Sequence, residues 1–477
     1  MPFQGSLIKK LYIQTARPFA IDSMKNLQRE GNGMNKKTID GPVYDARELG
    51  TPRMLVLGLQ HMFAMFGATV LVPALTGLDV ATTLLFAGLG TLLFHLLTKK
   101  KVPAFLGSSF AFIPGYAAIA PHGEADLLVY ACCGVACVGI MYAILSALFK
   151  TYGIKKVMRF FPPIVTGPII IAIGLNLSSS AISNCSTNWL IAIVAIVVVI
   201  GANMYGKGMI KIIPILLGVM VSYIFAVIID PAARANVAAA VAGAKWFGLP
   251  IYWNRTVFGL FASGKVDGAL LTSALLTIVP LSLATMVEHI GDICAISSTC
   301  ERNYLVDPGL NRTLLGDGLA TSLAALFGAP ANTTYGENTG VLALSRVYDP
   351  RVIRLAAVFA IIFSFCPKFA ALVSAMPGAT IGGVSLILYG MISAVGVRNV
   401  VENKVDFTNT RNVIIAALIL VLAIGINYAG SVQIGIVSLS GLAVASIVGI
   451  LLNAILPGKD YEFGVDAQGD TAVNFKV

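Results

Sequence analysis

The chain has 477 residues, of which 57% are hydrophobic and 12% are charged, and its mean hydropathy is +0.83. Soluble domains contain roughly 45–50% apolar and about 25% charged residues, so this composition excludes a water-soluble enzyme. The formal net charge of +10 does not by itself indicate a nucleic-acid partner, because lysine and arginine record the topology of a membrane protein and are read by position.

The first 53 residues are polar, mixed in charge and poorly periodic. They contain no apolar core of about 7–15 residues followed by a cleavage site of small residues, so we expect no secretory signal peptide. We expect this segment to be a disordered cytoplasmic tail. The natural start is open between Met1 and Met34, since Gln28–Gly31 could be encoded by a purine-rich ribosome-binding sequence.

Fourteen segments that could cross a membrane follow the tail. A spanning helix needs about 20 residues. Twelve apolar runs lie near residues 54–75, 80–98, 128–149, 160–178, 188–204, 212–229, 269–297, 313–328, 352–366, 378–394, 412–427 and 434–456. Two shorter segments, 104–121 and 330–345, are interrupted by Gly, Ser, Thr and Pro, which is typical of discontinuous elements that line a cavity.

The positions of the basic residues support a count of fourteen. With the amino terminus in the cytoplasm, the inner loops hold 17 of the 33 Lys and Arg residues, the tails hold 11 and the outer loops hold five. A count of twelve would place Lys99–Lys101 and Lys150–Arg159 on opposite faces. We therefore expect both termini in the cytoplasm. The predicted organisation is a tail at 1–53, a first seven-segment repeat at 54–229, an outer loop at 230–267, a second repeat at 268–456 and a tail at 457–477.

Similar short motifs occur in the two halves. His61 in the first segment matches His289 in the eighth, and a Pro-Ala pair follows after 42 and 41 residues respectively. Small polar residues come after each pair, and Phe110 and Glu337 each lie seven residues past the proline. Seven segments per half give the two halves opposite orientations, so the match predicts an inverted repeat, with coincidence as the alternative.

The two broken segments predict a binding site for a flat, neutral ring. A short extended stretch followed by a half-helix points backbone N–H groups toward the membrane centre. The amides of Phe110 and Gly336 would hold the ring, and the aromatic faces of Phe110, Tyr335 and Tyr389 would cover it. The alternative for the small residues, Ser108 among them, is tight helix packing.

Ionisable residues inside the membrane carry the strongest functional signal, because an acid there costs about 2.5–3.5 kcal/mol. Glu288 and Asp292 are four residues apart and share one helical face, whereas His289 points elsewhere. Glu337 lies in the second broken segment and His61 in the first segment. The alternatives are that neighbouring hydroxyl groups satisfy the acids and that His61 is a packing residue.

Two converging acids suggest both substrate recognition and ion coupling. A carboxylate accepts hydrogen bonds from ring N–H groups, and a carboxyl group removed from water can bind and release a proton near neutral pH. The chain has no G-x-x-x-x-G-K-[ST] loop, no H-E-x-x-H pattern and no G-x-S-x-G elbow. The sequence therefore predicts a secondary transporter and not an enzyme. No cofactor is expected; the coupling ion is H+, with Na+ open.

Four runs of sequence resemble the nucleobase–ascorbate transporter family. They are Leu59–Thr69, Ala104–Phe112, Glu288–Asp292 and Asn332–Val341, and the resemblance extends from about Leu55 to Pro457. Within the family, the chain looks most like the bacterial uracil permeases. The resemblance implies an all-α fold of fourteen segments in a 7+7 inverted repeat, with a short extended strand in segments three and ten. It also implies a core of segments one to four and eight to eleven, and a gate of the other six.

The same resemblance assigns roles to individual residues. Glu288 and Glu337 look like the carboxylates that bind the pyrimidine, and the amides of Phe110 and Gly336 look like donors to its carbonyl groups. The residues expected to bind substrate are Glu288, Glu337, Phe110, Gly336, Tyr335, Tyr389 and Ser109. Those expected to couple protons are Glu288, Asp292, Glu337 and His61.

The predicted function is proton-coupled uracil uptake across the cytoplasmic (inner) membrane by alternating access. Two residues depart from the family pattern: Ser345 replaces a Thr, and Asp292 stands where some uracil permeases have His and purine-transporting relatives have an acid. A xanthine- or urate-type symporter is therefore the nearest alternative, followed by an anion transporter or channel on the same architecture. Membrane lipid and a second copy, bound through the gate, are the expected partners. Nucleic acid is not.

Overall fold

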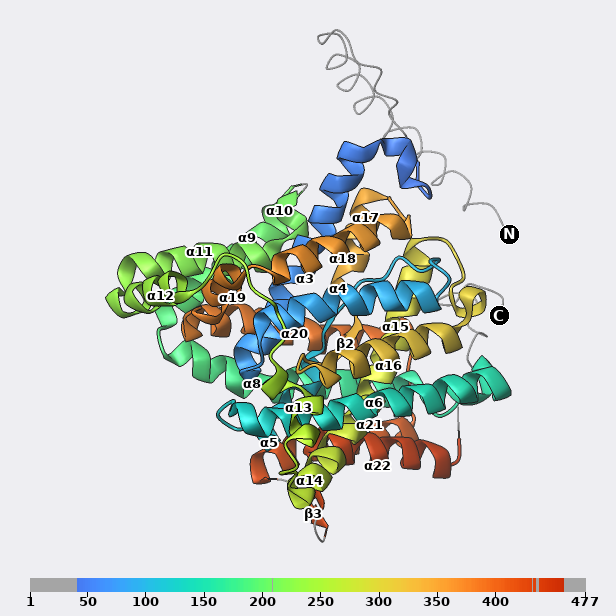
Figure 1. Ribbon diagram of the computed structural model, residues 1–477. Coiled ribbons are helices and arrows are strands. Elements are labelled where there is room, and N and C mark those ends of the chain that lie inside the picture. Colours follow the sequence, from blue (N-terminus) through green and yellow to red (C-terminus); the bar gives the residue numbers. More distant parts are fainter. Residues whose placement is uncertain (1–40, 208, 431, 435–436, 459–477) are drawn as a thin grey trace, which may run out of the picture. The chain divides into compact units, whose positions relative to one another are not determined.

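The structure is a computed structural model that describes residues 41–207, 209–430, 432–434 and 437–458 (Figure 1). The chain divides into two units, Met1–Pro42 and Val43–Val477, and every element described below belongs to the second. Residues 1–40, which include Met34, and residues 459–477 belong to the predicted tails and lie outside the described residues.

Helices make up most of the first half of this unit. They are η2 (Ala46–Leu49), α3 (Thr51–Thr76), α4 (Val80–Leu97), η3 (Phe110–Phe112), α5 (Ile113–Ile119), α6 (Ala125–Tyr152), α7 (Ile154–Met158), α8 (Pro163–Ser186), α9 (Trp189–Tyr205), α10 (Met209–Ile212) and α11 (Pro214–Ile229). The short strand β1 (Leu106–Ser108) lies between α4 and η3.

The second half repeats this mixture of long helices and short strands. Its helices are α12 (Pro231–Gly243), η4 (Trp253–Arg255), α13 (Val257–Ala262), α14 (Gly268–Ile278), η5 (Val279–Leu281), α15 (Ser282–Thr299), η6 (Leu305–Gly309), α16 (Leu310–Leu326), α17 (Glu337–Ser345), α18 (Pro350–Ser364), α19 (Pro367–Ser374), α20 (Gly378–Glu402), α21 (Thr410–Ala429) and α22 (Gly441–Ile455). Its strands are β2 (Asn332–Thr334), β3 (Val432–Ile434) and β4 (Val437–Leu439).

Local signals set the ends of these helices. Asp79 caps α4, since its carboxylate accepts a hydrogen bond from the Thr82 N–H at 2.7 Å. Pro163 and Pro214 occupy the first positions of α8 and α11, where a missing N–H costs nothing. Gly77, at φ +84°, ends α3 in the left-handed conformation. The breaks between apolar runs in the sequence therefore become helix ends.

The chain is a multi-pass membrane protein. Among the described residues, seven helices are long and apolar enough to cross a membrane, and nine if two bent pairs count, α11 with α12 (111°) and α18 with α19 (87°). Each of the fourteen predicted segments overlaps a helix. However, η3 with α5, α9 and α22 are shorter apolar helices of 10–17 residues. The helix lengths thus support part of the predicted count.

Some predicted boundaries differ from the structure. The last segment, predicted at 434–456, is helical from Gly441, because β3 and β4 form an antiparallel hairpin before it. The predicted tail at 1–53 is folded near its end, where Val43 forms a parallel bridge with Val347 and the Ala46 N–H donates to the Asp349 carboxylate at 2.7 Å. The predicted outer loop at 230–267 contains α12, η4 and α13.

The long helices pack mainly within two groups. The first group is α3, α4, α6, α16 and α18, and the second is α8, α9, α11, α20, α21 and α22. Glycines allow close approach in both: a Cβ on Gly139 of α6 would lie 2.7 Å from the Gly318 oxygen of α16. Large apolar side chains of the second group are exposed, such as Val197 (60%), Ile228 (63%) and Val421 (66%). Lipid rather than water suits such a surface.

The strands β1 and β2 join the two halves of the sequence. They come from the two predicted broken segments, 104–121 and 330–345, and pair antiparallel with Gly107 opposite Thr333. A side chain at Gly107 would collide with the Tyr335 ring, since a Cβ would lie 2.7 Å from Cε2. The prediction that each broken segment contains a short strand is confirmed.

Candidate functional site

Each of the two paired strands leads directly into a helix start. Strand β1 is followed by η3 and α5, and β2 is followed by α17. The N-cap residues are Ser109 and Gly336, and among the side chains that the structure describes, none caps either start. Because the first N–H groups of a helix have no partner within it, both starts can offer backbone donors to a bound molecule.

A local two-fold symmetry of the strand pair relates these two starts. Its centre is the pair of Gly107 and Thr333. Two flanking bonds, both 2.9 Å, run from the Ser109 N–H to the Ala331 oxygen and from the Tyr335 N–H to the Phe105 oxygen. They lie equally far from the centre. Phe110 and Gly336 are each three residues beyond it, so the residues with the predicted amide donors occupy equivalent positions.

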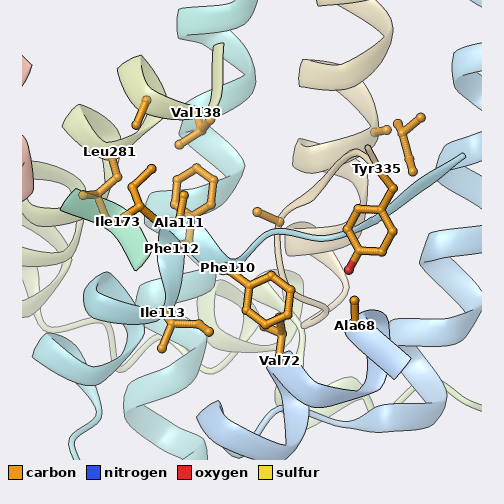
Figure 2. Packing of buried hydrophobic residues seen from close by; sticks show 14 of the residues in the cluster. Ala68, Val72, Phe110, Ala111, Phe112, Ile113, Val138, Ile173, Leu281 and Tyr335 are labelled. Atoms are coloured by element: carbon orange, nitrogen blue, oxygen red, sulfur yellow. The ribbon is translucent and has the colours of Figure 1, made fainter. Parts of the chain in front are cut away.

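Aromatic side chains lie around the first start. Phe110 contacts Tyr389 of α20 edge to face, with ring centroids 6.0 Å apart and an interplanar angle of 75°. Figure 2 shows the rings of Phe110 and Tyr335 next to α3. The Tyr335 hydroxyl donates to the Ser108 oxygen at 2.7 Å. The structure thus brings Phe110 and Tyr389 together and holds Tyr335 against β1.

Helix α15 carries two acidic residues, one of which borders the second start. Glu288 and Asp292 are one turn apart and partly exposed. A Cβ on Gly336 would lie 3.1 Å from Asp292 Oδ1, so this carboxylate borders the beginning of α17. Glu337 is the first residue of α17, but its side chain is not among those that the structure describes. The convergence of Glu288 with Glu337 therefore stays a prediction.

Two predicted site residues have unused hydrogen-bonding groups. His61 of α3 is fully buried, and neither ring nitrogen has a hydrogen-bond partner among the described residues. Its backbone oxygen lies 3.5 Å from Asn338 Nδ2 of α17. The Ser109 hydroxyl is also buried without a partner in the described part of the chain. The protein contacts that the structure describes therefore do not satisfy the polar groups of either side chain.

A buried acid that the sequence analysis missed holds β2 in place. Asp317 Oδ1 of α16 accepts hydrogen bonds from the N–H and the hydroxyl of Thr334, both at 2.8 Å. Because that hydroxyl has one proton, its oxygen accepts from His289 Nδ1, also at 2.8 Å. His289 thus points to β2, and Asp317 completes a polar chain behind the site. An acid between two glycines inside the predicted segment 313–328 was the available signal.

Comparisons with known sequences cover most of the chain. The sequence pattern of the permease family matches residues 52–431. The uracil permease of Bacillus caldolyticus is 40% identical over 439 residues, which cover 89% of this chain and 96% of the relative. The uracil permease of Bacillus subtilis is 38% identical, with 92% and 99% covered. The putative pyrimidine permease RutG of Escherichia coli is 35% identical, with 88% and 93% covered.

Solved structures of transporters have a similar fold. A structure of SLC26A9 matches with a TM-score of 0.62 and 12% identity, covering 86% of this chain and 66% of that one. The transmembrane domain of the cyanobacterial bicarbonate transporter BicA matches with a TM-score of 0.54 and 14% identity, covering 87% and 99%. At such low identity, these similarities show the fold alone.

Proposed function

The chain belongs to the nucleobase–ascorbate transporter family, as its motifs predict, and from this premise we propose that it is a proton-coupled uracil symporter of the cytoplasmic membrane. Members of this permease family are transporters and not enzymes. The observation that carries the proposal is the 38–40% identity to two uracil permeases over 96–99% of their lengths.

The chemistry of uracil fits the two helix starts. Uracil is planar and neutral, with two carbonyl acceptors and two N–H donors. In our proposal, the amides of Phe110 and Gly336 donate to its carbonyl groups, and Glu288 and Glu337 accept from its N–H groups. The equivalent positions of Phe110 and Gly336 support this arrangement, because carbonyl groups at two places on one ring require separate donors. The edge-to-face contact of Phe110 with Tyr389 supplies an aromatic cover for the ring.

Two further residues complete the proposed binding site. The Tyr335 ring flanks the base in an orientation fixed by its bond to the Ser108 oxygen. The Ser109 hydroxyl, which has no hydrogen-bond partner among the described residues, is available to the base or to a water molecule beside it. Both residues are adjacent in sequence to an amide donor, so a shift of either backbone would alter all of these contacts together.

Protons are the proposed coupling ions. Glu288 and Asp292 are partly exposed, which allows them to exchange protons with water. Acids are costly to move through hydrocarbon in the ionised state, so a proton taken up with uracil lowers the cost of reorienting the loaded site. Glu337 would share this proton, and the ring nitrogens of His61, for which the described part of the chain supplies no partner, offer a further site for it.

The two helix groups support transport by alternating access. In our proposal, the group of α3, α4, α6, α16 and α18 belongs to a core that carries the site and moves against a gate formed by the second group. The fourteen crossings form a 7+7 inverted repeat with both termini in the cytoplasm, and the distribution of basic residues supports this orientation. A homodimer through the gate would cover part of its exposed apolar surface.

Uptake of labelled uracil by cells that express the chain tests the proposed substrate. We expect saturable uptake that unlabelled uracil abolishes and xanthine does not. Saturable uptake of labelled xanthine, with no uptake of uracil, would instead identify a purine symporter. A chloride conductance independent of uracil would identify an anion pathway on the same architecture.

The coupling ion needs a separate measurement. Uracil entry should make the external medium more alkaline, and an uncoupler of the proton gradient should stop accumulation. Uptake that follows an imposed sodium gradient and ignores the proton gradient would overturn the proton assignment.

A further inference from the structure

Helix α4 holds the outer edge of β1 through two side chains. Thr91 Oγ1 accepts a hydrogen bond from the Leu106 N–H at 2.9 Å. One turn later, His95 Nε2 lies 2.9 Å from the Ala104 oxygen. A carbonyl oxygen can only accept, so Nε2 carries a proton and donates it to this bond. Both side chains are fully buried and use these groups to fix the strand.

Helix α16 holds β2 by the same pattern. Asp317 Oδ1 accepts from the Thr334 N–H at 2.8 Å, and Thr321 Oγ1 donates to the Asn332 oxygen at 2.9 Å. In both helices the acceptor precedes the donor by four residues, which places the two side chains on one face. At β1 the bound groups are the Ala104 C=O, just before the strand, and the Leu106 N–H; at β2 they are the Asn332 C=O and the Thr334 N–H. Each C=O precedes its N–H by two residues, which is the spacing of groups along one edge of a strand.

The two helices also contact each other at matching positions. The residue before each acceptor is a glycine, Gly90 in α4 and Gly316 in α16. A Cβ on Gly90 would lie 3.1 Å from the Ala320 Cβ, and a Cβ on Gly316 would lie 2.9 Å from Phe94 Cδ2. Ala320 and Phe94 each come three residues after the acceptor of their own helix. The helices therefore form a matched frame around the strand pair.

We propose that Thr91 and His95 are positioning residues for substrate binding, which set the direction of the Phe110 amide relative to that of Gly336. This inference rests on the proposed function, in which both amides bind uracil. A pair of three-residue strands has little stability of its own, so its place depends on the helices that hold its edges. Leu106, the residue bound by Thr91, lies four residues before Phe110. Loss of the Thr91 hydroxyl would free this part of β1 to shift.

Substitutions on α4 test the positioning role. Thr91→Val and His95→Leu remove the hydrogen bonds with little change in size, and each should raise the KM for uracil about tenfold at unchanged Vmax. Thr91→Ser keeps the hydroxyl and should stay within about twofold of the wild type. Thr98→Val is the matched control, because the buried Thr98 hydroxyl donates to the Phe94 oxygen of its own helix at 2.8 Å and has no other side-chain or backbone partner among the described residues.

Uracil analogues separate positioning from a general loss of structure. Pyrimidin-2-one and pyrimidin-4-one each lack one carbonyl group and one ring N–H of uracil, and their inhibition constants against uracil uptake are compared in the wild type and in Thr91→Val. If Thr91→Val displaces the Phe110 amide, it should weaken the binding of uracil more than the binding of the analogue that lacks the carbonyl group facing this amide. The effects of the substitution and of the missing carbonyl group on the inhibition constant are then not additive. A merely structural change weakens all three ligands by the same factor, which would overturn the inference.

Two other outcomes are also decisive. Uracil uptake in the wild type with an unchanged KM in Thr91→Val and His95→Leu would overturn the inference and leave the proposed function intact. A wild type that takes up no uracil would instead overturn the proposed function. Membrane abundance is measured for every variant. If Thr91→Val does not reach the membrane, the analogue comparison on His95→Leu, which removes the N–H donor to the Ala104 oxygen, gives the same decision.

Discussion

The two junctions between strand and helix share one backbone plan but differ in the groups that hold them. At the junction of β1 with η3, the side chains of Thr91 and His95 bind the backbone of the strand and of the residues before it, and an aromatic ring, that of Phe110, follows. At the junction of β2 with α17, the acid Asp317 binds the strand, and the carboxylate of Asp292 borders the helix start. The structure thus places an aromatic ring at one helix start and a carboxylate beside the other.

The largest effect is expected from breaking the second junction at Asp317. Asp317→Ala leaves the N–H and the hydroxyl of Thr334 buried with no acceptor from α16. Each buried group left unpaired costs about 1–3 kcal/mol, so we expect the free energy of unfolding to fall by about 3 kcal/mol and uracil uptake to fall to background. Asp317→Asn keeps one oxygen acceptor and should lose less. Wild-type uptake by Asp317→Ala would show that the acid does not hold the site.

A smaller effect is expected from crowding the second helix start. In Gly336→Ala, the new methyl group would lie 3.1 Å from Asp292 Oδ1, a tight contact that displaces the carboxylate. We expect the KM for uracil to rise about fivefold, equivalent to about 1 kcal/mol. Gly340→Ala is the control on the same helix, because a Cβ there has nothing within 4 Å. Equal KM values for the two variants would show that the position of the Asp292 carboxylate does not affect uracil binding.

Changes to the aromatic cover sharpen the description of the first junction. Phe110→Leu loses the edge-to-face contact with Tyr389, and such contacts contribute about 0.5–1.5 kcal/mol. We expect the constant for inhibition of labelled uracil uptake by unlabelled uracil to rise about threefold to tenfold. Tyr389→Phe keeps the ring pair and should stay within about twofold. If Tyr389→Phe is the more damaging of the two, the hydroxyl and not the ring face contributes to binding.

The smallest effect is expected at the segment before α3. The partly exposed Asp45 carboxylate pairs with Arg351 at 2.7 Å, and its hydrogen bond with Arg47 lowers the pKa of Asp45 below its ordinary value of 3.8. A lowered pKa in the folded state stabilises the protein above pH 3.8, and this stabilisation is lost as the pH falls below it. Asp45→Asn should therefore leave uptake at pH 7 unchanged. Its small difference in melting temperature from the wild type should be the same at pH 7 and pH 5 and should narrow below about pH 4.

Local composition was sufficient to predict the long apolar helices and the broken segments, but not the helices inside the predicted outer loop. A run such as that of α6 is long and apolar enough to identify by itself, and the small polar residues after Pro103 and Pro330 marked both interruptions. The hairpin of β3 and β4 was missed because a short apolar run rich in Val and Ile reads the same as part of a buried helix. The secondary-structure propensities of so few residues do not distinguish a β-strand from part of a buried helix.

Contacts between distant residues were beyond reach of the sequence pattern. The pairing of Gly107 with Thr333 depends on two helices that hold strands more than 200 residues apart, and no local signal records that register. The bridge of Val43 with Val347 is of the same kind. Asp317 was within reach, since an acid inside an apolar segment is itself a signal. Asp292 was predicted as a coupling residue, and its position beside Gly336 became visible only in the structure.

Binding of labelled uracil to the purified protein, compared with Glu288→Gln and Glu337→Gln, tests the central claim most directly. The amide nearly matches the carboxylate in shape, but it neither carries a charge nor titrates. We predict saturable binding by the wild type and at least about a hundredfold loss of affinity in both variants, with unchanged thermal stability. Saturable binding of wild-type affinity in both variants would show that the two acids do not hold the base.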